Sequence, residues 1–82
     1  MEPAVSAPAY VPSLPDRLRQ AQLPPPSVRR RMRGQATLRD VGRELGVAAM
    51  TVQRWETGVM TPRLEHAIAY RALLDALSDV AL

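Results

Sequence analysis

The sequence contains no cysteine and no phenylalanine, and it has one tryptophan and one histidine among its 82 residues. Without cysteine the chain can form neither a disulfide nor a thiolate metal site, which fits a reducing compartment. One histidine gives no basis for a histidine-based metal site. No apolar run approaches the roughly 20 residues that a membrane span needs, and the chain begins without a signal-peptide pattern. We therefore expect a soluble, cytoplasmic protein with no metal, no cofactor and no membrane partner.

Lysine is also absent, so the eleven basic residues are all arginine and the net charge is +3. Eight arginines fall between Arg17 and Arg43, whereas the stretch from Glu44 to the end has three arginines and five acids. Basic charge concentrated in one half indicates a polyanionic partner, either nucleic acid or an anionic surface. A compositionally biased genome would also produce exclusive use of arginine.

Proline is concentrated at the start of the chain, where residues 1–26 hold seven of the eight prolines. Proline interrupts helices and removes backbone donors, so we expect residues 1–26 to form a flexible arm that is also a candidate contact for a protein partner. Within this arm, Ser13 as N-cap and Pro15 in the first turn predict one short helix over residues 14–23. Residues 27–82 then form a single small domain.

Helical periodicity accounts for the rest of the chain. We expect helices over residues 27–33, 37–45 and 49–57, and a longer helix from Pro62 at its first position to Val80. The second of these helices opens with a Thr-x-x-Asp capping arrangement. No segment alternates with a period of two over a useful length. The predicted class is all-α, with four or five helices in a compact domain.

The helices over residues 37–45 and 49–57 are separated by a short turn, which is typical of a helix-turn-helix. Gly46 suits the positive φ that ends the first helix. Gly42 lies midway along that helix although glycine costs about 1 kcal/mol there, which indicates a close helix crossing. Val52 and Trp55 are three residues apart and share a face. We expect them to join a core with Val41, Leu45 and Val47.

With this face buried, the opposite face of the helix is predicted to point outward. It carries Ala49, Met50, Gln53 and Arg54. A projecting helix fits the major groove, which is about 12 Å wide. There Arg can donate two hydrogen bonds to guanine, and Gln can form a bidentate pair with adenine by donating one hydrogen bond and accepting one. The phosphate-contact candidates are Arg29, Arg30, Arg33, Arg39 and Thr51.

Residues 37–74, TLRDVGRELGVAAMTVQRWETGVMTPRLEHAIAYRALL, resemble the Cro/CI-type (xenobiotic-response-element-like) helix-turn-helix family of phage and bacterial regulators. The matching elements are Gly42, Gly46-Val47, Val52, Arg54-Trp55-Glu56, Gly58 and Pro62, and the resemblance covers residues 26–77. It implies a lambda-repressor-like domain in which the helix over 49–57 enters the major groove of DNA. It also implies base contacts at the four outward residues and an ion pair between Glu56 and Arg31 or Arg30.

The leading hypothesis is a sequence-specific regulator of the repressor kind that binds double-stranded DNA as a homodimer or on tandem sites. The alternative is an interaction protein with the same fold, such as an antitoxin-like or anti-repressor factor. It is motivated by Leu38, where the family often has glutamine, and by the apolar pair Val59-Met60, where a basic residue is frequent. No phosphate loop, metal cluster or nucleophile–base set suggests catalysis.

Several residues keep two interpretations at this level. The residues Tyr70, Leu73 and Leu74 fit either a dimer face or the monomer core. The pair Val59-Met60 fits either a partner contact or a local plug. We expect His66 to lie on a helix surface.

Overall fold

A computed structural model describes residues 13–80, and this part of the chain forms five α-helices and no strand. In chain order they are α1 (Leu14–Gln20), α2 (Pro26–Arg33), α3 (Leu38–Leu45), α4 (Ala49–Glu56) and α5 (Leu64–Val80). The predicted all-α class is confirmed. Residues 1–12 of the expected arm and residues 81–82 lie outside the described residues.

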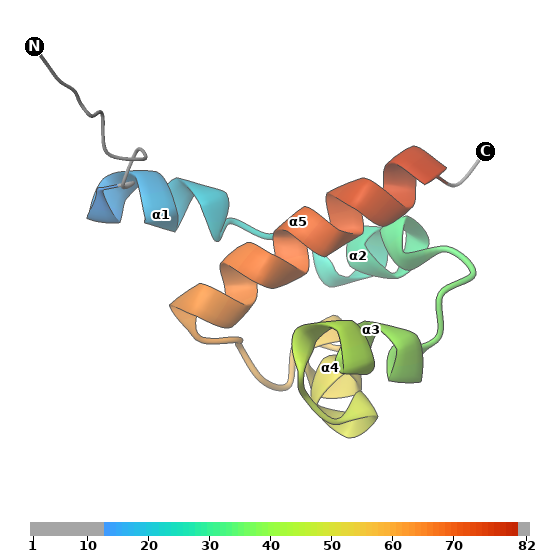
Figure 1. Ribbon diagram of the computed structural model, residues 1–82. Coiled ribbons are helices and arrows are strands. Elements are labelled where there is room, and N and C mark those ends of the chain that lie inside the picture. The colour runs from blue at the N-terminus through green and yellow to red at the C-terminus, as the bar shows by residue number, and fades with distance from the viewer. Residues whose placement is uncertain (1–12, 81–82) are drawn as a thin grey trace, which may run out of the picture.

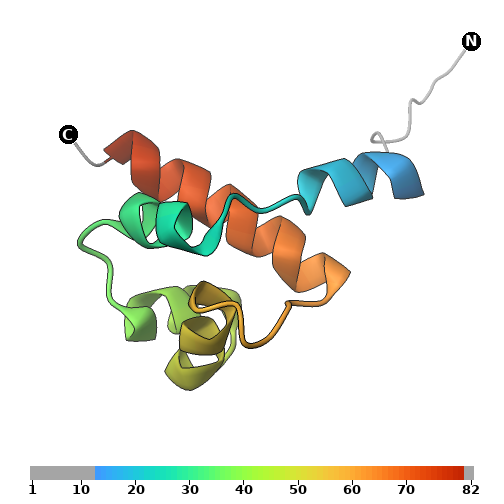
Figure 2. The ribbon, with the colours of Figure 1, turned by 180° about the vertical axis from the view of Figure 1, so that it is seen from behind.

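The 17-residue helix α5 is the element around which the others are arranged. Helices α1, α2 and α3 all contact it, and α4 packs against α2 and α3 (Figures 1 and 2). The buried core brings together three of these elements, namely α3, α4 and α5. Its members are Val41, Val52, Trp55, Tyr70 and Leu74. Leu73 packs against this cluster, so the three α5 residues with two interpretations belong to the monomer core.

Local sequence signals explain where the helices begin and end. The Thr37 hydroxyl accepts from the Asp40 amide at 3.0 Å, and the Asp40 carboxylate accepts from the Thr37 amide at 3.0 Å. This reciprocal arrangement satisfies two amides that the helix leaves free, and it confirms the predicted capping box. Ser13 similarly accepts from the Asp16 amide at 3.3 Å and starts α1. The predicted short helix is therefore present, although it ends at Gln20.

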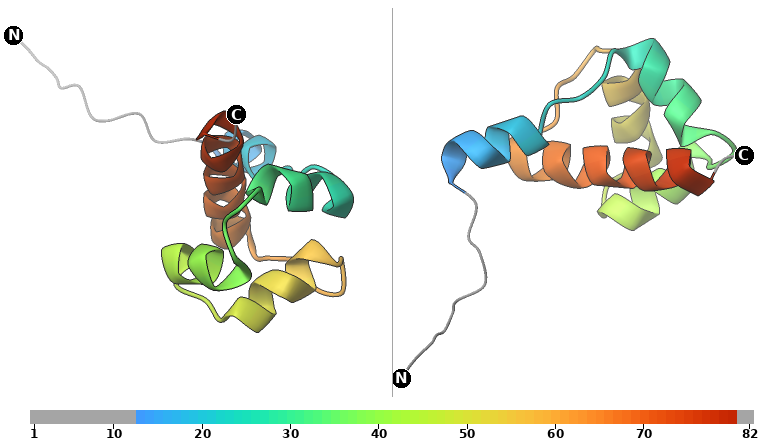
Figure 3. Two further views of the ribbon diagram at one scale, coloured as in Figure 1. Left: turned by 90° about the vertical axis from the view of Figure 1, so that its right-hand side faces the viewer. Right: turned by 90° about the horizontal axis from the view of Figure 1, so that it is seen from above.

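The expectation of a mobile arm does not hold for residues 13–23. Helix α1 lies beside the first half of α5 (Figure 3, right). The Arg71 guanidinium donates to the Arg19 carbonyl at 3.2 Å and to the Gln22 carbonyl at 3.0 Å. Leu23 packs against the core. A cation on α5 thus binds one carbonyl in the last turn of α1 and one just beyond it, and this attaches the segment to the domain.

Helix α5 begins two residues later than predicted. Pro62 was expected at its first position, but the helix starts at Leu64 and Pro62 is buried in the preceding loop. There it lines a groove with side chains of the α1 region, including Leu18 and Leu23. Packing of the proline ring, rather than its preference for a helix start, fixes its position. As a consequence Arg63 lies in the loop, exposed to solvent.

Candidate nucleic-acid interface

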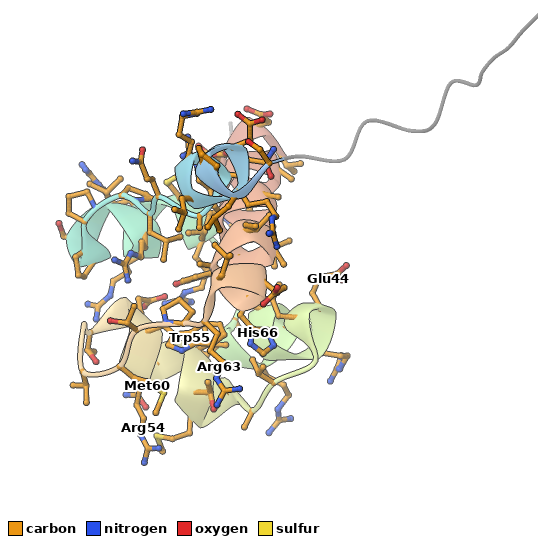
Figure 4. The ribbon with its side chains drawn as sticks, turned by 90° about the vertical axis from the view of Figure 1, so that its left-hand side faces the viewer. Glu44, Arg54, Trp55, Met60, Arg63 and His66 are labelled. Carbon is orange, nitrogen blue, oxygen red and sulfur yellow. The ribbon has the colours of Figure 1, made fainter. Side chains whose placement is uncertain are left out.

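The outward face of α4 is the centre of the candidate site. Met50 is 55% exposed, Gln53 and Arg54 are exposed, and Ala49 is partly buried. Within residues 13–80, neither the Gln53 amide nor the Arg54 guanidinium has a hydrogen-bond or ion-pair partner. Figure 4 shows Arg54 pointing away from the body of the molecule. The four predicted base-contact residues thus share one side of α4, and the described part of the chain leaves the Gln53 and Arg54 side chains of that side unpaired.

The opposite face of the same helix is fixed in the core. Val52 is fully buried and Trp55 is 3% exposed. The Trp55 ring lies 5.3 Å from the Tyr70 ring and 5.6 Å from the His66 ring, centroid to centroid, in tilted arrangements that aromatic pairs favour. Burial of the valine and the indole is confirmed. His66 was expected on a helix surface, but its ring packs against the indole and is partly buried (Figure 4).

The turn between α3 and α4 holds the two helices close together. Gly46 has φ of 74°, the left-handed conformation that glycine adopts without strain. A Cβ at Gly42 would lie 2.6 Å from the Val47 carbonyl oxygen, so only glycine fits at this crossing. The Val47 amide donates to the Gly42 carbonyl at 2.8 Å. Both glycine predictions are confirmed, and the tight turn sets how far α4 projects.

Two arginines of α2 fasten the C-terminal end of α4. The Arg29 Nη1 donates to the Trp55 carbonyl at 2.7 Å, and its Nε donates to the Pro24 carbonyl at 2.6 Å. The Arg33 guanidinium forms a bidentate pair with the Glu56 carboxylate, at 2.7 and 2.8 Å, and also donates to the Ala36 carbonyl at 2.7 Å. Fork-to-fork pairing of this kind is geometrically specific.

These contacts correct the predicted ion pair and two of the predicted phosphate contacts. Arg31, the first candidate partner of Glu56, is exposed and is not its partner. Arg30, the second candidate, approaches Glu56 at 3.4 Å but is itself 68% exposed, so Arg33 is the main partner. Arg29 and Arg33 were predicted to contact phosphate, yet both are occupied within the protein because they share the side of α2 that faces α4.

The electrostatics of the buried pair follow from this geometry. The Arg33 hydrogen bonds lower the pKa of Glu56, against the opposing effect of burial, and the Arg33 and Arg30 charges lower it further. In return, the hydrogen bonds to Glu56 raise the pKa of Arg33. Glu56 is therefore a buried carboxylate kept ionised by its partner. It serves to position α4 rather than to contact a ligand.

Exposed cationic side chains remain on α2, on α3 and in the loop after α4. Of the predicted phosphate contacts, Arg30 and Arg39 are exposed and Thr51 is partly buried. Arg63 was not predicted, but the late start of α5 leaves it exposed in the loop after α4, where Figure 4 shows it. The sequence signal for Arg63 was its position directly after Pro62, because a proline that packs in a loop leaves the next residue outside the helix.

The loop after α4 presents apolar side chains to solvent. Val59 is 77% exposed and Met60 is 41% exposed. The Met60 amide donates to the Arg54 carbonyl at 3.1 Å, which ties the loop to the end of α4. The exposure of Val59 is incompatible with a local plug. The loop and the outward face of α4 are thus connected parts of one surface.

Other kinds of site have less support in the described part of the chain. Residues 13–80 contain no group of three or more His, Cys, Asp or Glu side chains that could hold a metal ion. Nor does any helix in this range have the length and hydropathy needed to cross a membrane.

Comparisons with known proteins return no relatives. No protein-family model matches the chain, and no significant match was found among curated proteins or solved structures. The resemblance to the Cro/CI-type family therefore rests on the residues of the chain itself.

Proposed function

We propose that the protein is a sequence-specific, double-stranded DNA-binding regulator of the Cro/CI type, with α3 and α4 as its helix-turn-helix. The observation that carries this proposal is the division of α4 into two faces. One face is fixed by Trp55 and Glu56, while the other presents Gln53 and Arg54, whose side chains have no partner among residues 13–80. A rigid helix whose exposed side chains can form bidentate hydrogen bonds is the arrangement that reads base edges in the major groove.

The charge distribution supports the same proposal. The exposed arginines Arg30, Arg39 and Arg63 are candidates for phosphate contacts, which provide affinity and position the protein without selecting a sequence. The N-cap of α4, Ala48, has no side-chain hydrogen bond to the first turn. The first-turn amides therefore receive no capping bond from Ala48, and the Met50 amide is a candidate donor to a phosphate oxygen. In this assignment the arginines hold the DNA and α4 selects the sequence.

The experiment begins with selection of preferred sites from random duplexes, followed by titration of the selected site. Arg54→Ala should weaken binding to the preferred site by about 1–3 kcal/mol and relax the preference at one base position. Arg54→Lys is the matched variant, because it keeps the charge but lacks the rigid, planar fork of the guanidinium, so it should reduce the preference at that base while retaining most non-specific binding. Arg39→Ala should weaken all sequences alike and reduce the salt dependence.

The proposal fails if Gln53→Ala and Arg54→Ala both bind every sequence as the wild-type protein does. It also fails if no duplex binds at low salt, where phosphate contacts are strongest. That second outcome would favour the alternative, a protein-interaction module, for which the exposed Val59 and Met60 are the supporting observation. Selection would in addition show whether the site is two-fold symmetric, as a homodimer requires, or a tandem repeat.

A further inference from the structure

Met50 is a large apolar side chain that the fold leaves exposed in the first turn of α4. It is 55% exposed, whereas Met32 packs against the core. Within residues 13–80, Met50 belongs neither to the core cluster nor to the partly buried residues that pack on it. A single exposed apolar residue is ordinary on a protein surface, so its position decides its role.

The position of Met50 is set by its spacing from Arg54. The two residues are four apart in one helix, so their side chains are neighbours on the same side of α4, with Cβ atoms about 5–6 Å apart. Successive base pairs of DNA are about 3.4 Å apart along each strand. When Arg54 contacts a guanine, Met50 therefore lies over a base pair one or two steps away.

The residues before Met50 have little or no side chain. Gly46 and Ala48 are exposed, and Ala49 is partly buried. This end of α4 can therefore approach a surface closely, and Met50 is the first long side chain that it brings there. Methionine has three rotatable bonds and a polarisable thioether, so its end adapts to the shape that it meets.

The chemistry of this end of α4 is apolar. The side chains of Ala48 and Ala49 form no hydrogen bonds, and a thioether is only a weak acceptor. In the major groove, the apolar group that a base pair presents is the methyl at C5 of thymine. A 5-methylcytosine carries the same group at the same ring position. Met50 is thus matched to a pyrimidine C5-methyl rather than to a donor or acceptor.

We infer that Met50 is a specificity-determining residue that contacts a methyl group at C5 of a pyrimidine, one or two base pairs from the guanine that Arg54 contacts. The inference rests on the proposed function and adds an apolar component to the hydrogen bonds of Gln53 and Arg54. Thymine and 5-methylcytosine both supply the methyl group. If the site has cytosine at that position, cytosine methylation regulates the binding.

The experiment uses the full-length chain and the duplex obtained by site selection. Each thymine is replaced in turn by uracil, which removes the methyl group and keeps the base pair, and each cytosine in turn by 5-methylcytosine. If thymine is the source, one uracil replacement per half-site should weaken wild-type binding by about 3- to 5-fold, the contribution of one buried methyl group. If 5-methylcytosine is the source, one methylated cytosine per half-site should strengthen binding by a similar factor.

Variants of Met50 assign this effect to its side chain. Met50→Ala should bind the duplexes with and without the methyl group equally, whereas Met50→Leu keeps an apolar side chain and should retain the difference. Met60→Ala is the matched control, because Met60 is also exposed but lies in the loop after α4, and it should respond as the wild type does. Chemical denaturation should show that Met50→Ala is as stable as the wild type, since the side chain is outside the core.

Two results would overturn the inference and leave the proposed function intact. In one, the wild-type protein binds the selected duplex but responds to none of the methyl replacements. In the other, Met50→Ala shows the same methyl effect as the wild type, so that another side chain makes the contact. Failure of every duplex to bind at low salt is a separate outcome, which refutes the proposed function and this inference together.

Discussion

The two faces of α4 differ in every respect that bears on function. The inner face holds Val52, Trp55 and Glu56, all buried, with ring contacts and a bidentate ion pair. The outer face holds Gln53 and Arg54, exposed and without side-chain partners within residues 13–80. One eight-residue helix thus uses one face to stabilise the fold and leaves the other face available for binding. Substitutions on the inner face should change stability, and substitutions on the outer face should change binding alone.

The largest effect is expected where the inner face buries most area. Trp55→Ala removes the indole from between Tyr70 and His66 and leaves a cavity in the core. It should lower the free energy of unfolding by about 3–5 kcal/mol, as measured by chemical denaturation. In a domain this small, that is a large part of the total stability.

The control for this prediction is the neighbouring residue on the outer face. Arg54→Ala should change the free energy of unfolding by no more than about 0.5 kcal/mol, because the side chain has no partner in the described part of the chain. If the two variants unfolded at similar denaturant concentrations, the separation between the faces would be refuted.

The second-largest effect on the free energy of unfolding is expected from the Arg33–Glu56 ion pair, and it depends on pH. Glu56→Gln removes the charge from the buried carboxylate that Arg33 binds, and at neutral pH it should cost about 2–3 kcal/mol of the free energy of unfolding. The folded-state pKa of Glu56 lies below its ordinary value of 4.5. Its contribution is therefore fully present above that value and is lost as the pH falls through the lower pKa of the folded state.

Denaturation of wild type and variant across a pH series measures this effect. The two curves should be separated at pH 7 and should converge at acid pH, as the pH falls through the lowered folded-state pKa and the carboxylate becomes protonated. Glu44→Gln, at an exposed position, should follow the wild type throughout. A constant separation down to pH 2 would show that the glutamine disrupts packing rather than charge.

The division of α4 could be predicted from the sequence because it depends only on local spacing. Val52 and Trp55 lie three residues apart, which fixes the inner face, and the outer face follows from it. Gly42 was predictable for a similar reason, since a glycine within a helix indicates a close approach. The 2.6 Å distance from its Cβ position to the Val47 oxygen gives the physical basis.

The roles of the α2 arginines depend instead on how that helix is rotated against α4, which the sequence does not specify. Arg29 and Arg33 are four residues apart and share a face, and that face meets the end of α4. The four-residue spacing places both on one face of the helix, but it does not show whether that face points inward or toward a ligand. Docking of α1 was unpredictable for a related reason, because it depends on Arg71, about fifty residues away in the chain.

The smallest effect on the free energy of unfolding is expected at the Tyr70 hydroxyl, a buried polar group in the core beside Trp55. Tyr70 is fully buried, and its hydroxyl has no hydrogen-bond partner within residues 13–80. Burial, and secondarily the Glu56 carboxylate, raise the pKa of Tyr70, so the neutral phenol is the form present. Tyr70→Phe keeps the ring against Trp55 and removes an unsatisfied donor, so it should leave the free energy of unfolding unchanged or raise it by up to about 1 kcal/mol.

Chemical denaturation at pH 7 measures this change. The control is Tyr70→Leu, which loses the aromatic ring and should be destabilised. A loss of more than about 1 kcal/mol in Tyr70→Phe would mean that the hydroxyl has a partner and that the inner network extends into α5.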